Sequence, residues 1–241
     1  MSKLITIWGS PNSGKTTLAV KLALELDSRK AGNIMVVHAD NITPALPVVF
    51  PFERDILSIG NALSTVEITQ TEILLATVTA KGRDNLGFVG YTYGDNQFSY
   101  PAFDKQKAIE FLTVLKSIAD YVIVDCSSQY NNILSRAALS TADTTIKLAT
   151  PEPKAISFFF SQTPLYVSPE YELTEAVQGL NITQSGFYQP VEECREYFKN
   201  PAFTLPFCQQ IQEQAAAGEL MKEVHDKIYR KEIAKIAEQI C

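Results

Sequence analysis

The stretch GSPNSGKTT, residues 9–17, decides how the rest of the chain is interpreted. It fits the pattern G-x-x-x-x-G-K-[ST], in which a glycine-rich loop surrounds the phosphates of a nucleotide with backbone N–H groups. The matching residues are Gly9, Gly14, Lys15 and Thr16. A short apolar, β-branched run, LITIW at 4–8, precedes the loop, and leucines at helical spacing follow it. The sequence therefore predicts a strand, a phosphate-binding loop and a helix in direct succession.

Each part of this loop has a chemical role in holding a nucleoside triphosphate with Mg²⁺. The Lys15 ammonium would reach the terminal phosphates, and the Thr16 hydroxyl would ligate Mg²⁺. The first N–H groups of the following helix add partial positive charge. A glycine-rich turn that binds nothing is the alternative. The predicted nucleotide-binding residues of the loop are Gly9, Ser10, Pro11, Asn12, Ser13, Gly14, Lys15, Thr16 and Thr17.

Length and composition predict a single α/β domain over residues 1–241. The chain is 46% hydrophobic, which is enough for one sizeable core. Its net charge of −6 disfavours nucleic acid, so contact with DNA or acidic lipid would need a local basic patch. The sequence contains no signal peptide, no membrane-length apolar run and no paired cysteines. We therefore expect a cytoplasmic protein with reduced thiols.

Apolar strand-like runs alternate with helical patterns along the chain. This alternation predicts a mainly parallel sheet with helices on both faces, a three-layer α/β/α fold that binds ligands at the carboxyl ends of its strands. The expected strands are 4–8, 34–38, 86–93, 121–126 and 144–150, and the expected helices are 15–30, 66–81, 104–119, 131–142 and 153–163. The segment 164–210 gives no clear assignment, and we expect helix from 210 to the end.

Two carboxylates stand where predicted strands end. Asp125, after the apolar run in DYVIVDCSS, could hold Mg²⁺ through its water shell. Asp40, in IMVVHADNITP, could orient the attacking water or reach the metal. Both positions also suit an aspartate that begins a turn, and His38 suits a structural histidine. The predicted catalytic residues are Lys15, Asp40 and Asp125, and the predicted metal ligands are Thr16, Asp40 and Asp125.

In this order, the motifs resemble the MinD/ParA family of P-loop ATPases over nearly the whole chain. The stretches that carry the resemblance are GSPNSGKTT, VVHADNITP, DYVIVDCSS, ALSTADTTIKLATPEPKAI and LPFCQQIQEQAAAGEL. The resemblance implies ATP and Mg²⁺ as cofactors, Asp125 as the Walker B carboxylate and Asp40 as the second aspartate of a D-x-D motif. It also implies that the loop around Thr150, Pro151 and Glu152 holds the adenine.

The departures from the family pattern concern the same motifs. Family members typically read G-K-G-G-x-G-K-[ST], and their extra lysine reaches across a nucleotide-sandwiched dimer, whereas this chain has Ser10 there. Loss of that ammonium predicts slow hydrolysis with retained binding. His38 replaces the first aspartate of D-x-D, and Pro11 and Asn12 replace two glycines, which stiffens the loop. Loss of the lysine resembles the TadZ-like branch, and a divergent partition or conjugation ATPase is the other interpretation.

The resemblance implies a nucleotide-switched homodimeric ATPase that positions a cargo or machine in partition, conjugation, or pilus or secretion assembly. The alternative is a nucleotide-bound scaffold with little or no hydrolysis, which Ser10 favours and Asp40 opposes. We expect a partner protein, with DNA as a further candidate and a membrane surface as a less favoured one. The C-terminal stretch has apolar residues near helical spacing and balanced charges, so we expect it to pack against the core.

Overall fold

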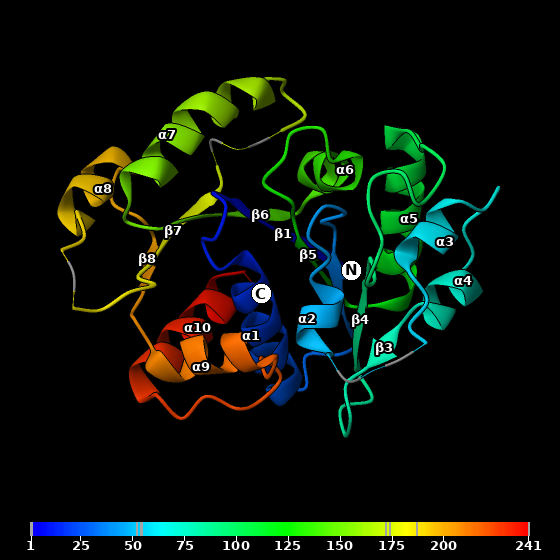
Figure 1. Ribbon diagram of the computed structural model, residues 1–241, viewed down its shortest axis with the longest axis horizontal. Coiled ribbons are helices and arrows are strands. Elements are labelled where there is room, and N and C mark those ends of the chain that lie inside the picture. Colours follow the sequence, from blue (N-terminus) through cyan, green and yellow to red (C-terminus); the bar gives the residue numbers. More distant parts are fainter. Residues whose placement is uncertain are drawn as a thin grey trace.

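The protein is described by a computed structural model that covers residues 2–51, 53, 55–171, 173, 175–186 and 188–240. Within these residues, an eight-stranded sheet of order β3-β4-β2-β5-β1-β6-β7-β8 runs through the molecule (Figure 1). The strands are β1 (Lys3–Gly9), β2 (Ile34–His38), β3 (Val78–Thr79), β4 (Leu86–Gly90), β5 (Tyr121–Asp125), β6 (Thr144–Ala149), β7 (Val177–Asn181) and β8 (Phe203–Leu205). Only the pairing of β3 with β4 is antiparallel among the described strands. The mainly parallel sheet is thus confirmed.

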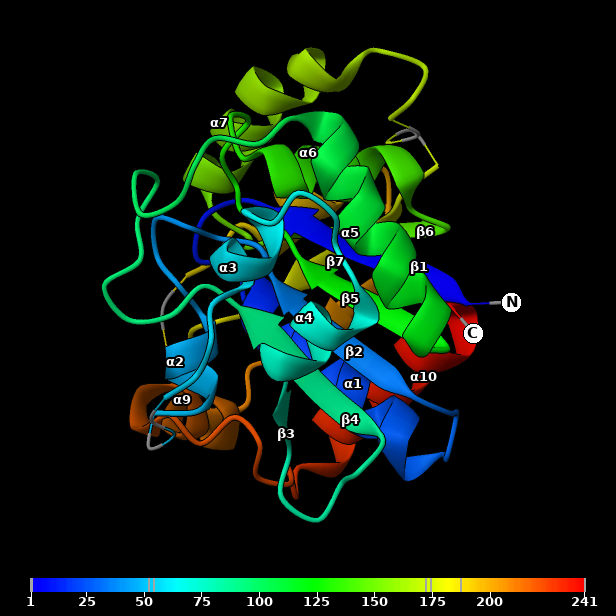
Figure 2. The same ribbon diagram turned by 90° about the vertical axis from the view of Figure 1, so that its right-hand side faces the viewer.

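Helices cover both faces of the sheet (Figures 1 and 2). One face packs against α1 (Lys15–Ser28), α9 (Gln209–Ala217) and α10 (Lys227–Ile240). The other face packs against α5 (Lys105–Ile118), α6 (Ile133–Thr141) and α7 (Pro153–Gln162). The shorter helices are α2 (Leu46–Val49), α3 (Ile59–Leu63), α4 (Gln70–Leu75), the 3-10 helix η1 (Thr163–Tyr166) and α8 (Val191–Tyr197). The fold therefore has the expected three layers.

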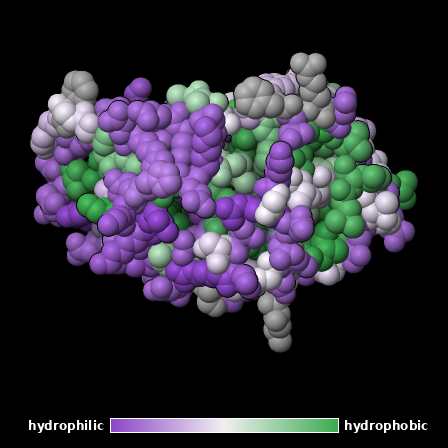
Figure 3. All heavy atoms as spheres, turned by 90° about the horizontal axis from the view of Figure 1, so that it is seen from below, coloured by the Kyte–Doolittle hydropathy of each residue, from purple (hydrophilic) through white to green (hydrophobic). Residues whose placement is uncertain are grey.

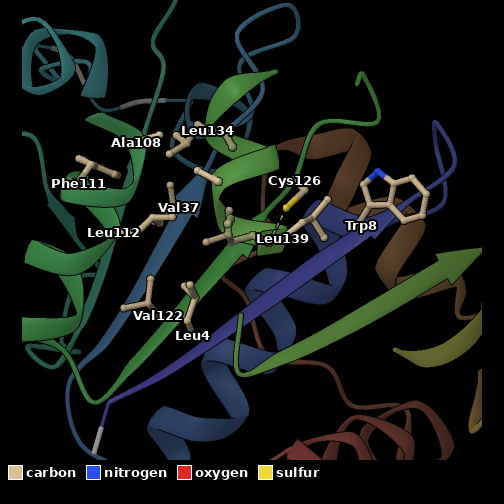
Figure 4. Close-up of a cluster of buried hydrophobic side chains, with 14 of the residues drawn as sticks. Leu4, Trp8, Val37, Ala108, Phe111, Leu112, Val122, Cys126, Leu134 and Leu139 are labelled. Atoms are coloured by element: carbon tan, nitrogen blue, oxygen red, sulfur yellow. Dashed lines mark hydrogen bonds between the residues drawn. The ribbon is translucent and has the colours of Figure 1, made fainter. Parts of the chain in front are cut away.

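The side chains of β1 alternate between the two faces of the sheet, as the period of two in a strand requires. Leu4 and Trp8 belong to the core beneath α5, α6 and α7, whereas Ile5 and Ile7 belong to the core beneath α1 and α10. Figure 4 shows the first of these cores, with side chains of α5 and α6 lying over those of β1, β2 and β5. Burial on both faces explains why the central strands are almost wholly apolar.

Helix α10 packs its apolar side against α1 and β8. Ile233, Ile236 and Ile240 are buried, whereas Ile228 is 68% exposed. The surface over α9 and α10 is largely hydrophilic, and hydrophobic surface gathers instead on the side of α4 (Figure 3). The expected packing of the C-terminal helix against the core is confirmed. Among the described residues, no helix is both long enough and apolar enough to cross a membrane.

Several expected element boundaries were wrong. The expected helix 66–81 is reduced to α4, which a Thr69–Glu72 capping box begins. The β-branched pair at 78–79 instead forms β3, because pairing with β4 overrides the local helical pattern. The expected strand 86–93 ends at Gly90. The expected continuous helix after 210 is interrupted, because Gly218 has a φ of 68° and ends α9 with a left-handed cap.

The segment 164–210, which the sequence left unassigned, contributes two strands to the sheet. Strand β7 pairs in parallel with β6, and β8 pairs in parallel with β7. Both strands are short, and Gln178, Gly179 and Asn181 interrupt the apolar pattern of β7. They bring the end of β7 and the segment after β8 to the edge of the sheet where β1 ends.

Candidate functional site

A cavity of about 540 Å³ opens at the carboxyl ends of β1, β5 and β7. Its walls come from the phosphate loop (residues 9–17), the loop after β2, the segment after β5, the end of β7, the segment after β8, and α9. Parallel strands end at the same edge of a sheet, which is where α/β folds bind ligands. The cavity therefore lies where the sequence predicts a site.

The backbone of the phosphate loop depends on residues that tolerate close approach or positive φ. A Cβ on Gly9 would lie 1.9 Å from the carbonyl oxygen of Leu148, so no side chain fits where β1 approaches β6. Gly14 has a φ of 88°, and a Cβ there would lie 2.4 Å from Asn181 Nδ2. Asn12 has a φ of 59°, in the left-handed region that asparagine tolerates. The loop conformation thus follows from its own residue types.

Two side chains from other elements fasten the loop. Asn181 Nδ2 donates a hydrogen bond to the carbonyl oxygen of Ser13 at 2.9 Å, and Ser128 Oγ donates to that of Gly9 at 2.7 Å. The hydroxyls of Ser10 and Ser13 are buried and have no hydrogen-bond partner in the described part of the chain. Buried polar groups without partners are uncommon. Neither residue lines the cavity, so these hydroxyls do not themselves face a bound ligand.

The Lys15 ammonium is held against the loop itself. Its Nζ donates to the carbonyl oxygen of Ser10 at 2.9 Å and to Ser128 Oγ at 2.8 Å, with a longer contact of 3.4 Å to the carbonyl oxygen of Gly9. These acceptors are all uncharged. Phosphate oxygens would form stronger, charge-assisted hydrogen bonds with the same ammonium.

The surroundings of Lys15 have two opposite effects on the pKa of its ammonium. Burial lowers the pKa of its ammonium from the usual value of 10.5, while the nearby Asp125, Cys126 and Asp40 favour the charged form. A cation that has lost solvent gains from an added anion, whereas the nearby carboxylates would repel phosphate unless a cation such as Mg²⁺ lies between them. The loop is therefore electrostatically suited to phosphate that binds together with such a cation.

Strands β2 and β5 and the first turn of α1 bring three polar side chains together at the centre of the site. Thr16 Oγ1 donates to Asp125 Oδ2 at 2.6 Å, and His38 Nδ1 lies 2.9 Å from the same oxygen. The contact follows from the sheet order, since β5 lies between β1 and β2, and His38 pairs in register with Asp125. Asp125 is only 4% exposed and His38 is fully buried.

Asp40 both begins a turn and lines the cavity. Its Oδ1 accepts hydrogen bonds from the backbone N–H groups of Ile42 at 2.8 Å and Thr43 at 3.0 Å. Its Oδ2 accepts a hydrogen bond from Ser127 Oγ at 3.0 Å. The two interpretations of Asp40 from the sequence are therefore compatible, and its carboxylate connects the loops that follow β2 and β5.

The oxygen donors of the site suit Mg²⁺. In the described residues, no three His, Cys, Asp or Glu side chains form a metal-binding cluster. The donors near the loop are the Thr16 hydroxyl and the Asp125 carboxylate, with Asp40 in the same cavity. Mg²⁺ prefers such hard oxygen ligands and usually keeps several waters, so one or two protein ligands with phosphate oxygens are enough. These residues therefore fit the ion.

The remaining residues that the sequence predicts to bind nucleotide lie in different places relative to the cavity. Pro11 and Asn12 are exposed at the rim of the cavity, and Thr17 lines it. Pro151 and Glu152, expected near the adenine, lie outside the lining that the described residues form.

Sequence reasoning missed the wall of the cavity that the end of β7, the segment after β8 and α9 form. The residues of this wall come from the segment without an assignment and from α9; they include Asn181, Ile182, Thr183, Pro206, Ile211 and Gln212. The available signals were the polar residue at the end of VQGLN and the stretch LPFCQQIQEQAAAGEL, which carries part of the family resemblance.

The glycine-rich loop between β1 and α1, facing the Asp at the end of β5, defines a P-loop nucleotide-binding fold. No protein-family model and no curated protein sequence matches the chain. Solved structures, however, match it over nearly the whole length.

Three of these similar structures are informative. The septum site-determining protein MinD complexed with Mg-ADP from Pyrococcus horikoshii OT3 has a TM-score of 0.72 and 17% identity, covering 100% of this chain and 96% of that one. A ParA family ATPase from Chlorobium tepidum TLS has a TM-score of 0.75 and 13% identity, covering 98% of both chains. A putative plasmid partition protein from Borrelia burgdorferi B31 bound to AMPPNP has a TM-score of 0.69 and 20% identity, covering 99% and 98%. The chain thus has the fold of the MinD/ParA P-loop ATPases, as its motifs predict.

Proposed function

We propose that this protein is a MinD/ParA-like ATPase that binds ATP with Mg²⁺ in the cavity at the end of β1. The observation that carries the proposal is the hydrogen bond of 2.6 Å between Thr16 Oγ1 and Asp125 Oδ2, beside the Lys15 ammonium and under the glycine-rich loop. Two of the structures with the same fold hold a nucleotide, Mg-ADP in one and AMPPNP in the other. These neighbours support the choice of ligand.

The chain's own residues divide the binding of ATP between them. The backbone N–H groups of the phosphate loop and the first turn of α1 surround the phosphates, and Lys15 exchanges its uncharged acceptors for phosphate oxygens. Because Thr16 gives its hydrogen to Asp125, the lone pairs of its hydroxyl oxygen remain available to the metal. Mg²⁺, when bound, neutralises charge on the phosphates.

We assign the base to the wall formed by Asn181, Thr183, Pro206 and Gln212, in place of Pro151 and Glu152. This wall lies in the same cavity as Lys15 and offers amide and hydroxyl groups beside an apolar ring. Asn181 already donates from Nδ2 to the phosphate loop, so its Oδ1 is the atom available to accept a hydrogen bond from a base.

Hydrolysis is the second part of the proposal. Asp40 would orient the attacking water, because its carboxylate lines the cavity and its position is fixed from both sides by hydrogen bonds. Ser10 supplies no ammonium and is 2% exposed, so we expect turnover to be slow. The alternative, a nucleotide-bound scaffold without meaningful turnover, is favoured by this same residue.

The cellular role completes the proposal: a single-domain, nucleotide-switched homodimer that positions a partner protein of partition, pilus or secretion type. The hydrogen bond between Ser127 and Asp40 supports a switch, since it joins the two loops nearest the phosphates. The buried free thiols of Cys126, Cys194 and Cys208 fit a reducing cytoplasm, the compartment that we propose.

A direct test measures binding, turnover and assembly with the full chain. Calorimetry with ATP, ADP and a non-hydrolysable analogue, each with and without Mg²⁺, should register binding that Mg²⁺ strengthens. Phosphate release separates the ATPase from the scaffold, and light scattering with ATP against ADP detects the dimer. Absence of nucleotide binding in excess Mg·ATP would refute the proposal.

A further inference from the structure

His38 lies where the proposed metal site meets the hydrophobic interior. It ends β2, is fully buried, and its Nδ1 lies 2.9 Å from Asp125 Oδ2. The Phe88 ring, from the neighbouring strand β4, stacks against it with ring centroids 6.2 Å apart and an interplanar angle of 14°. Strands on both sides thus hold the imidazole in one place.

We propose that His38 is a positioning residue for Asp125: its Nδ1–H holds Oδ2 of the carboxylate, so that Oδ1 faces the Mg²⁺–nucleotide. This inference rests on the proposed function, and it assigns His38 a part in metal binding in place of a purely structural one. The Asp125 Oδ1 atom makes no hydrogen bond to any described residue.

The hydrogen-bond pattern selects one tautomer of the ring. Asp125 Oδ2 already accepts a hydrogen from Thr16 Oγ1, and an ionised carboxylate can only accept, so His38 Nδ1 must be the donor. If Nδ1 carries the one proton of the ring, Nε2 is an acceptor. His38 Nε2 is buried without a partner in the described residues. A lone acceptor in that place is tolerated better than a buried N–H without a partner.

His38 matters as a second donor to Asp125 Oδ2 because Thr16, the other donor, is also proposed to bind the metal. Thr16 is proposed to ligate Mg²⁺ through its hydroxyl oxygen, so the same group would both contact the metal and donate to the carboxylate. His38 is fixed by the sheet and can keep the carboxylate oriented in the presence or absence of the ion. Residues that orient metal ligands in this way typically change metal affinity by about 10–100-fold when removed.

Mn²⁺ affinity in the presence of saturating ADP, followed by electron paramagnetic resonance, tests the proposal with the full chain. We expect His38→Ala to weaken Mn²⁺ binding by about 10–100-fold. His38→Asn, whose Nδ2 can occupy the place of Nδ1, should restore affinity to within about threefold of the unmodified protein, which is within about 0.7 kcal/mol. ADP affinity measured in EDTA should be the same in all three proteins.

Phe88→Leu is the matched control, because it removes the stacking partner of His38 and keeps the hydrogen bond. We expect it to lower the melting temperature without changing Mn²⁺ affinity. Equal Mn²⁺ affinity in His38→Ala and the unmodified protein, loss in Phe88→Leu as large as in His38→Ala, or no restoration by His38→Asn overturns the inference. If the unmodified protein binds no ADP, the proposed function fails and this inference fails with it.

Nitrogen NMR of the unmodified protein supplies a second measurement that does not depend on whether His38→Ala folds. The chain has two histidines, His38 and the exposed His225, so the spectrum of a His225→Gln variant assigns the signals. We expect a proton on His38 Nδ1, the atom that lies 2.9 Å from Asp125 Oδ2. A proton on Nε2 with Nδ1 bare would overturn the proposal.

Discussion

The phosphate loop comes from one continuous stretch of chain, whereas the proposed base wall is assembled from the end of β7, the segment after β8 and α9. Residues 9–17 shape the loop, the phosphate end of the site, through their own glycines and the left-handed Asn12. Asn181, Pro206 and Gln212, from three separate segments, meet in the wall, the base end of the site.

The two ends also differ in what holds them. At the base end, the buried Lys21 of α1 donates from Nζ to Gln214 Oε1 at 2.7 Å and to the carbonyl oxygens of Leu220 at 2.5 Å and Lys222 at 2.8 Å. These contacts fix the end of α9 and the segment after it, which form part of the cavity wall. Substitutions at the phosphate end should therefore lower ATP affinity with little change in the free energy of unfolding. Substitutions that remove the contacts of Lys21 at the base end should mainly lower the free energy of unfolding.

Lys15→Ala is the largest expected effect at the phosphate end. We expect ATP affinity to fall by about 100-fold or more, equivalent to about 2.7 kcal/mol, because the phosphates lose a charge-assisted donor. The free energy of unfolding should change little, because Lys15 and its partner Ser128 line the cavity, where water can take the place of the ammonium. Calorimetry and urea unfolding measure the two quantities. Lys231→Ala, on the exposed side of α10, is the control, and unchanged ATP affinity in Lys15→Ala would contradict the site.

Lys21→Met should show the opposite pattern. It leaves three acceptors of the base end without their donor, so we expect the free energy of unfolding to fall by about 3 kcal/mol. ATP affinity at a temperature where the variant is folded should fall less than in Lys15→Ala. Urea unfolding measures the first effect, with Lys231→Met as the matched control. A variant as stable as the unmodified protein would show that Lys21 does not hold this end.

The pH dependence of stability sharpens the same comparison. Burial lowers the pKa of Lys21 from its usual 10.5 to about 8. Above about pH 8 the folded protein releases this proton while the unfolded chain keeps it until about pH 10.5, so the contribution of Lys21 to stability rises with pH across that window. Below about pH 8 both states hold the proton and this contribution is flat. We expect the difference in unfolding free energy between the unmodified protein and Lys21→Met to grow from pH 8 to pH 10.

Asn181 contacts the phosphate loop and also belongs to the base wall. Of the substitutions considered, Asn181→Ala should have the smallest effect on ATP affinity and stability. It removes the hydrogen bond to the carbonyl oxygen of Ser13 and one polar group from the base wall. We expect a loss of about 1 kcal/mol in unfolding free energy and a similar loss, about fivefold, in ATP affinity. Calorimetry with ATP and with inorganic triphosphate separates the contributions. A fall in ATP affinity that is not larger than the fall in triphosphate affinity would argue against the base assignment.

The parts predicted from the sequence are those in which neighbouring residues decide the outcome. The strand, loop and helix around residues 9–17 follow from a local pattern, and the apolar runs predicted the central strands. The prediction was wrong at 66–81, where pairing with β4 makes a strand of residues that otherwise have a helical pattern. It was also wrong for residues 219–226, which follow the left-handed cap at Gly218 and form no helix before α10 begins.

The sequence by itself determined the phosphate loop and the fold class, because glycine positions and apolar periodicity act over a few residues at a time. The tertiary structure alone decided which side chains complete the site. His38 meets Asp125 only because β2 lies beside β5, and Asn181 reaches the loop only because β7 joins the sheet beyond β6. Such contacts depend on strand order, and the energy that sets strand order is spread over the whole core.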